Sequence, residues 1–140
     1  MDEAKVRQYF SNDVFARECG IELLHVGPGE ARVRMPLRPE HFNAVGIVHG
    51  GAVFTIADFA FAVASNSHGT LAVALNANIN FVKAAHEGAL SAEAREVTCS
   101  RRVGTYDVRV TNDAGELIAL FTGLAYRKNE PLPLDANPAE

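Results

Sequence analysis

The feature that most constrains this chain is a long apolar segment that begins at a pair of glycines. The segment runs from Gly50 to Ser65 and has the length of a helix. A helix that is apolar on every side is normally buried in the middle of a fold. Asp58 is the only Asp, Glu, Lys or Arg between Glu40 and Lys83. A lone carboxylate in such a helix is costly, so Asp58 is either a paired structural group or a functional one.

The composition is that of a single globular domain. The chain has 140 residues, 21% of them charged, which is ordinary for a globular domain. Its formal net charge is −4 at pH 7, so the composition gives no sign of the basic surface that binds nucleic acid. Asp58 interrupts the apolar run that comes closest to a membrane span. The charged N-terminus lacks a signal-peptide core. We therefore expect a cytoplasmic protein with no nucleic-acid or membrane partner.

The residue types that bind transition metals show no metal-ligand spacing. Cys19 and Cys99 are expected to be free thiols in a reducing compartment. Four histidines are assigned no role, namely His25, His41, His68 and His86. We therefore expect no metal.

The sequence on both sides of the central helix alternates as strands do. Two strands precede the helix, joined by the turn Gly27-Pro28-Gly29, and four follow it. The predicted strands are 21–26, 31–37, 71–81, 88–98, 103–111 and 116–127. Because the last four are joined by short connections, sequential neighbours should pair antiparallel. Residues 3–18 predict one or two short helices, and the proline-rich residues 129–140 predict a flexible tail after a single domain of residues 1–128.

These elements predict an α+β fold in which a curved antiparallel sheet of five to six strands wraps one long helix. The helix can be buried all round only if the sheet curls about it. The last strand is apolar on both faces, with Phe121 on one and Leu120 on the other. One face can cover the helix and the other needs a partner, so we expect a homo-oligomer.

Gly50 and Gly51 leave the N-terminus of the helix open to a ligand. Backbone N–H groups there are unpaired and can hold an oxyanion that develops on a carbonyl oxygen; a tight turn is the structural alternative. Asp58, seven residues after Gly51, would supply a base or a nucleophile. The separation is roughly 10–12 Å along the axis. One carbonyl can meet both groups only where two helices run antiparallel across a two-fold axis.

Other candidates lie around these two groups. Asn43 would bind the carboxylate or the substrate, or only cap the loop. His49 would transfer a proton or hold the loop by a hydrogen bond. Arg101 and Arg102 are adjacent cations in a turn, either a solvated corner or a phosphate site. Phe54 indicates apolar space near the helix, which core packing explains equally well.

The motif residues resemble one family of enzymes. The pattern comprises Asn43-x-x-Gly46-x-x-His49-Gly50-Gly51, then Ala57-Asp58 and Ala64-Ser65-Asn66. It resembles the hotdog-fold acyl-CoA thioesterases, and within them the PaaI-type branch, the phenylacetate-degradation thioesterases. The later segments Asn80-Phe81 and 119–123 fit the same branch, and the resemblance extends over residues 15–127.

The resemblance implies an enzyme that hydrolyses acyl-CoA thioesters to free acid and CoA. It implies no cofactor, because coenzyme A is part of the substrate, and a dimer or dimer of dimers with active sites between subunits. Gly50 matches the residue whose N–H polarises the thioester carbonyl more closely than Gly51 does. Asp58 of the neighbouring subunit would be the nucleophile or general base, and Asn43 and His49 would hold the site.

The chain departs from some relatives at Ala74. Those relatives carry Ser or Thr on the strand after the helix, where the hydroxyl helps to place water, whereas Ala74 leaves only a substrate-binding surface there, with Phe54. The alternative function is a non-catalytic module that binds acyl-CoA, and a dehydratase is a third, weaker option. Asp58 distinguishes the first two, because a binding module has no need of a buried carboxylate beside an oxyanion site.

Overall fold

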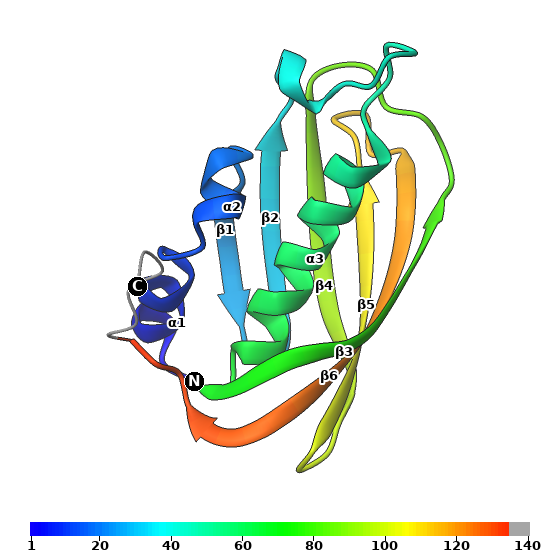
Figure 1. Cartoon of the computed structure of the whole chain (residues 1–140). Helices are drawn as coiled ribbons and strands as arrows, with labels where there is room; N and C mark the ends of the chain where they lie inside the picture. The colour runs from blue at the N-terminus through cyan, green and yellow to red at the C-terminus, as the bar shows by residue number, and fades with distance from the viewer. Residues whose placement is uncertain (135–140) are drawn as a thin grey trace.

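A long helix lies across the inner face of a six-stranded antiparallel sheet (Figure 1). The computed structural model describes residues 1–134. In chain order the elements are α1 (Glu3–Phe10), α2 (Val14–Glu18), β1 (Glu22–Gly27), β2 (Glu30–Pro36), the 3-10 helix η1 (Pro39–His41), α3 (Gly50–Asn66), β3 (Thr70–Phe81), β4 (Ala89–Cys99), β5 (Val103–Thr111) and β6 (Leu117–Pro131). The predicted α+β arrangement, the hotdog fold, is confirmed.

Strand β3 does not lie where its place in the chain predicts. The sheet order is β1-β2-β4-β5-β6-β3, so β3 pairs with β6 at one edge and β4 pairs with β2. The predicted pairing of β3 with β4 is therefore wrong. The connection between them, residues 82–88, passes the beginning of α3, where the Val48 N–H donates to Ala85 O at 2.9 Å. Because the sheet curls around α3, this segment crosses from the edge to the middle of the sheet over a short path.

The last strand is longer than predicted. β6 continues to Pro131, which pairs with Thr70 at the start of β3. Leu132 is buried, and its N–H donates to Gly69 O at 3.3 Å. The predicted boundary at residue 128 therefore falls inside the strand, because pairing with β3 and the burial of Leu132 hold a proline-rich segment that composition alone marks as a tail. Residues 135–140 of that predicted tail lie outside the described residues.

The core is the layer between α3 and the sheet. The buried face of α3 comprises Val53, Ile56, Ala57, Ala60, Phe61, Val63 and Ala64. The helix approaches β6 so closely that a Cβ on Gly123 would lie 2.6 Å from the Phe61 ring. Only glycine fits at that crossing, so a residue without a side chain sets the distance between helix and sheet. Within residues 1–134, none of the helices combines the length and hydrophobicity needed to cross a bilayer.

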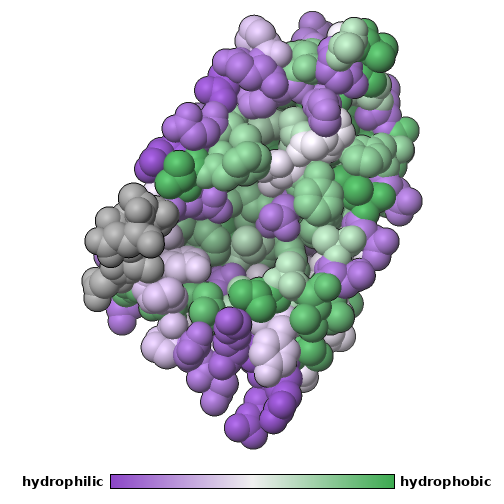
Figure 2. All heavy atoms as spheres, viewed as in Figure 1, coloured by the Kyte–Doolittle hydropathy of each residue, from purple (hydrophilic) through white to green (hydrophobic). Residues whose placement is uncertain are grey.

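One stripe of α3 is left uncovered. Its exposed or half-buried residues recur at helical spacing and are Gly51, Phe54, Thr55, Asp58 and Ala62. We call them the open stripe. Figure 2 shows this side of the molecule, where the surface is largely hydrophobic and the hydrophilic residues gather mostly at the rim. β3 lies at the adjacent edge of the sheet, so one of its edges has no neighbouring strand within the described chain.

A second apolar surface lies on the outside of the sheet. Val73, Tyr126 and Val103 sit in direct register across β3, β6 and β5. Each of the three is more than a third exposed. These residues are the outer apolar face that the alternation of the last strand predicts.

Candidate functional site

The N-terminus of α3 is capped by a histidine. His49 occupies the N-cap, and its Nδ1 accepts a hydrogen bond from the Gly51 N–H at 2.8 Å. The ring thus performs the task that Ser or Asp usually performs at this position. Because Nδ1 accepts, the proton of the neutral ring is on Nε2. This hydrogen bond fits the loop-holding role, one of the two considered for His49.

The two glycines are not equivalent. The Gly51 N–H is engaged by His49, whereas the Gly50 N–H makes no hydrogen bond within residues 1–134. A Cβ on Gly51 would lie 2.9 Å from His49 Nδ1, so this position must be glycine for the cap to form. A Cβ on Gly50 would lie 3.3 Å from the ring of Phe81, which is more than half exposed and can move. The free donor at the positive end of the helix is therefore that of Gly50.

The loop before α3 is held by its own polar groups. Asn43 Oδ1 accepts from the backbone N–H groups of Val45 and Ile47, at 3.1 and 3.3 Å. These two hydrogen bonds fit the loop-capping role considered for Asn43. His41, to which the sequence assigned no role, is buried, and its carbonyl accepts from the His49 N–H at 2.7 Å. His41 is thus a positioning residue for the helix N-terminus, which no spacing in the sequence reveals.

Asp58 is half-buried on the open stripe and has no hydrogen-bond or ion-pair partner in the part of the chain that the structure describes. Burial raises the pKa of its carboxyl above the ordinary value, and the negative charge of nearby Asp13 raises it further. Asp13 itself is the N-cap of α2 and accepts from the Ala16 N–H at 3.0 Å. The paired structural role is therefore not fulfilled within residues 1–134.

Two cavities lie near the candidate groups, one at Gly50 and one in the neighbourhood of Asp58. One, of about 260 Å³, opens at Gly50 and is also lined by Asn43, Phe81 and Lys83. Lys83 forms an ion pair with Glu116.

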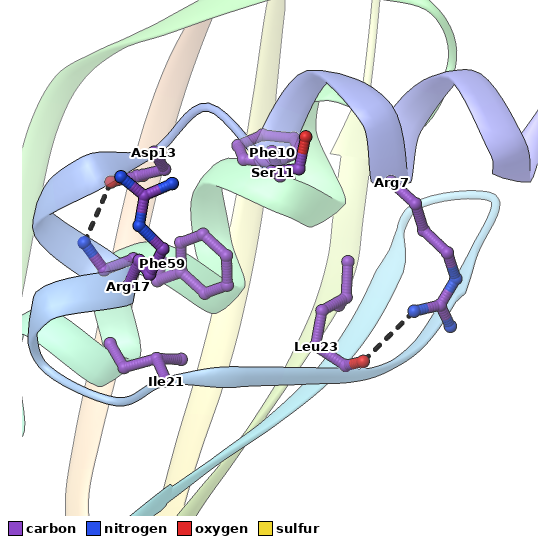
Figure 3. A pocket seen from close by; sticks show the side chains of 9 residues that line it. Arg7, Phe10, Ser11, Asp13, Arg17, Ile21, Leu23 and Phe59 are labelled. Atoms are coloured by element: carbon purple, nitrogen blue, oxygen red, sulfur yellow. Dashed lines mark hydrogen bonds between the residues drawn. The ribbon is translucent and has the colours of Figure 1, made fainter.

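The other cavity, of about 300 Å³, lies between α1, α2, β1 and Phe59 of α3 (Figure 3). We call it the aromatic cavity. Phe10 and Phe59 meet edge to face there, with ring centroids 5.7 Å apart. Arg7 at its rim is bound to Leu23 O at 3.1 Å, while the Arg17 side chain makes no hydrogen bond to any described residue. Asp13 also lines it, so the cavity reaches the neighbourhood of Asp58.

The remaining predicted site residues are not among those that line the cavity at Gly50. Phe54 packs against Phe121 with ring centroids 5.4 Å apart, and Ala74 is exposed on β3. Arg101 and Arg102 are exposed in the turn between β4 and β5. That turn lies at the end of the fold where α3 ends, as the contact of Glu96 with His68 shows. One chain alone therefore does not bring the arginine pair to the helix N-terminus.

Neither cysteine has the properties of a nucleophile. Cys19 and Cys99 are free, and burial raises the pKa of both thiols. A reactive cysteine needs the opposite shift.

Known proteins resemble this chain over a range that includes Gly50 and Asp58. Residues 45–119 match the sequence model of a family described as the Thioesterase superfamily. A putative esterase of Archaeoglobus fulgidus is 44% identical over 131 residues, which are 92% of this chain and 85% of the relative. The acyl-coenzyme A thioesterase PaaI of Escherichia coli is 34% identical over 119 residues, which are 84% of this chain and 85% of the relative.

Solved structures of related proteins have the same fold as this chain. The structure of the E. coli PaaI protein from the phenylacetic acid degradation operon superposes with a TM-score of 0.86 at 32% identity, covering 91% of this chain and 96% of that one. A Streptococcus mutans protein bound to acetyl CoA superposes with a TM-score of 0.76 at 28% identity, covering 79% of this chain and 90% of that one.

Proposed function

Because this chain belongs to the Thioesterase superfamily and to its PaaI-type branch, we propose that it hydrolyses acyl-CoA thioesters through Asp58 and the Gly50 N–H. The observation that carries the proposal is the state of Asp58. An unpartnered, half-buried carboxylate with a raised pKa costs the fold free energy, and no structural contact of the described chain offsets that cost. A role in chemistry accounts for it.

The two groups belong to different protomers of a dimer. Asp58 follows Gly50 by eight residues, roughly 12 Å along α3, so one carbonyl cannot touch both within a chain. The open stripe and the free edge of β3 are neighbouring surfaces, because α3 packs against β3. Pairing them about a two-fold axis sets two α3 helices antiparallel, with the Asp58 of one protomer near the Gly50 of its partner. The outer apolar face around Tyr126 would serve a dimer of dimers.

The chemistry then divides between the protomers. The Gly50 N–H of one protomer donates to the thioester carbonyl oxygen as that oxygen gains negative charge. The Asp58 carboxylate of the other attacks the carbonyl carbon, or removes a proton from a water that attacks it. The C–S bond breaks and CoA leaves as a thiolate that takes up a proton. If water is the nucleophile, the acid is released directly; if Asp58 is, a water molecule then hydrolyses the acyl–Asp58 anhydride, which releases the acid and restores the carboxylate. His49 and Asn43 act by holding the helix N-terminus in place.

The acyl group would occupy the aromatic cavity. Phe10 and Phe59 give it aromatic walls, and Asp13 connects it to the surroundings of Asp58. These walls favour an aryl acyl group such as phenylacetyl. The E. coli relative from the phenylacetic acid degradation operon supports the same choice and a place in aromatic-acid breakdown. Free cysteines suit a cytoplasmic enzyme.

Arg101 and Arg102 would bind the CoA phosphates across the dimer. Within one chain they lie at the end of the fold where α3 ends. Antiparallel pairing of two α3 helices sets that end of one protomer beside the helix N-terminus of the other. The arginines of the partner would then face the CoA that enters at Gly50.

A screen of aryl and aliphatic acyl-CoAs, with detection of the released thiol, tests the proposal. We expect turnover with a preference for aryl groups. Tight acyl-CoA binding without thiol release would favour the alternative, a non-catalytic binding module. Release of thiol at the wild-type rate by Asp58→Asn would remove Asp58 from the chemistry.

A further inference from the structure

We propose that His68, Glu96 and Cys99 form a binding site for a zinc-class divalent cation, at the corner where α3 ends and β4 meets β5. The Nε2 of His68, a carboxylate oxygen of Glu96 and the Sγ of Cys99 all lie within 4.8 Å of one another. Imidazole, carboxylate and thiolate are the three ligand types that zinc takes in proteins. None of these three residues belongs to the groups proposed for hydrolysis.

A β-bulge sets two of the ligands on one face of the sheet. The register between β4 and β5 shifts after Glu96, because Glu96 pairs with Tyr106 while Thr98 pairs with Thr105. Val97 is the extra residue and is exposed. Residues three apart in a regular strand point to opposite faces, whereas the bulge turns Glu96 and Cys99 to the same one. Bulges of this kind often re-aim side chains at sites.

The third ligand is positioned by the end of α3. His68 follows Ser67, whose buried hydroxyl accepts from the Gly29 N–H at 2.7 Å and donates to Ala64 O at 2.7 Å. This clamp fixes the chain where His68 leaves the helix. The His68 Nε2 then reaches Glu96 Oε2 at 2.7 Å.

Two glycines make room for the cluster. A Cβ on Gly29 would lie 2.8 Å from the Glu96 Cβ and 3.0 Å from its carboxylate, and a Cβ on Gly104 would lie 2.9 Å from the Tyr106 ring. The Tyr106 hydroxyl donates to Glu96 Oε2 at 2.7 Å. A hydrogen bond that orients a ligand carboxylate is the usual support of a metal site.

The charges suit a divalent cation once the thiol has lost its proton. The carboxylate and the thiolate together balance a charge of two, and the fourth position is open to water. Arg127 is the cation near both groups, and its Nη1 is held by Ser100 O at 2.9 Å. Tetrahedral zinc spaces its ligand atoms by roughly 3.3–3.8 Å, so binding opens the contact between His68 and Glu96 by about 1 Å or less.

The full-length protein is stripped with a chelator and titrated with zinc chloride by calorimetry. We expect one zinc ion per chain and release of protons, because the Cys99 thiol must ionise. Cobalt substitution should produce a thiolate-to-metal charge-transfer band. Zinc should also slow the reaction of Cys99 with a thiol reagent.

Matched variants decide the assignment. Cys99→Ser and His68→Gln should each lower the zinc affinity at least tenfold, and Cys99→Ser should abolish the charge-transfer band. Tyr106→Phe should lower the affinity by about 10–100-fold through the Glu96 carboxylate. Cys19→Ser and His25→Gln, which change the same residue types elsewhere, should bind zinc as the wild type does. Absence of stoichiometric binding at micromolar zinc, or full binding by Cys99→Ser, would overturn the proposal.

Discussion

The open stripe of α3 and the corner at the end of α3 each hold a half-buried carboxylate. The surroundings shift the pKa values of these two carboxylates in opposite directions. Asp58 on the open stripe has no hydrogen-bond or ion-pair partner in the described chain. Burial raises the pKa of its carboxyl, and the negative charge of Asp13 raises it further. Glu96 at the corner is also subject to burial, which alone would raise its pKa. Hydrogen bonds from Tyr106 and His68 outweigh burial there, so the pKa of Glu96 lies below the ordinary value.

The difference shows that burial alone does not decide what a carboxylate does. Where donors satisfy the ionised form, as at Glu96, the group stabilises the fold. Where none does, as at Asp58, withdrawal from water costs stability and leaves a reactive group. Substitution of Asp58 should therefore impair activity, whereas substitution of Glu96 should impair stability.

The largest effect is expected from Asp58→Asn. The change removes the nucleophile or base and should lower kcat by about a hundredfold or more. Because it also removes an unpartnered buried charge, the free energy of unfolding should stay the same or rise. Steady-state kinetics and denaturant unfolding measure the two quantities. Asp107→Asn, on an exposed residue of β5, is the matched control and should change neither.

Gly50→Pro tests the other half of the site. Proline at the first position of a helix is tolerated and removes the N–H, while its ring meets the exposed Phe81 side chain, which can move. His49, at φ −59° and ψ 135°, already has a conformation that a following proline accepts. We expect kcat to fall by about a hundredfold with a small change in melting temperature. Gly50→Ala, which keeps the N–H, is the control and should retain most activity.

Mixing the two inactive variants tests the division between protomers. A heterodimer of Asp58→Asn and Gly50→Pro has one site with both defects and one with neither, so up to half of its sites should recover. No recovery after subunit exchange, confirmed by mass spectrometry, would confine the site to one protomer.

The stability effects of substituting the two carboxylates should be opposite in sign, and both should disappear at low pH. Glu96→Gln should lower the free energy of unfolding at neutral pH by about 1–3 kcal/mol, and this loss should shrink as pH falls below the ordinary glutamate pKa, because the folded carboxyl then gains its proton as well. Any gain from Asp58→Asn should be present at neutral pH and vanish below the ordinary aspartate pKa, where the folded and unfolded carboxyls are both neutral. Denaturant unfolding from pH 7 to pH 3 measures both.

A smaller effect is expected from Asp13→Asn. Removing this charge should lower the pKa of Asp58, because like charges disfavour ionisation. The acidic limb of the kcat profile should therefore move to lower pH, with activity at neutral pH little changed. A shift to higher pH would mean that Asp13 acts on Asp58 by a route other than its charge.

The smallest effect is expected at the arginine pair. Arg101→Ala and Arg102→Ala should raise KM severalfold and leave kcat nearly unchanged, the pattern of lost uniform binding. Arg32→Ala, on an exposed residue of β2, is the control. An unchanged KM would identify the pair as a solvated corner of the turn between β4 and β5.

The sequence by itself determined the elements and the candidate groups. Apolar periodicity located α3 and all six strands, because burial on one face or on all faces imposes a period on the chain. The isolation of Asp58 in an apolar stretch and the glycines before it were visible for the same reason. If both groups act on one carbonyl, as we propose, the spacing between them requires a second protomer, since helix rise per residue is constant.

Tertiary structure alone decided how these groups are paired. The place of β3 at the edge next to β6, and the extension of β6 to Pro131, follow from contacts between distant residues that no local pattern encodes. The preference for Gly50 over Gly51 as the free donor depends on the rotamer of His49. The cluster of His68, Glu96 and Cys99 depends on the β-bulge in β4 and on the end of α3. His68 is distant in sequence from the other two residues, so the three come together only when the chain has folded.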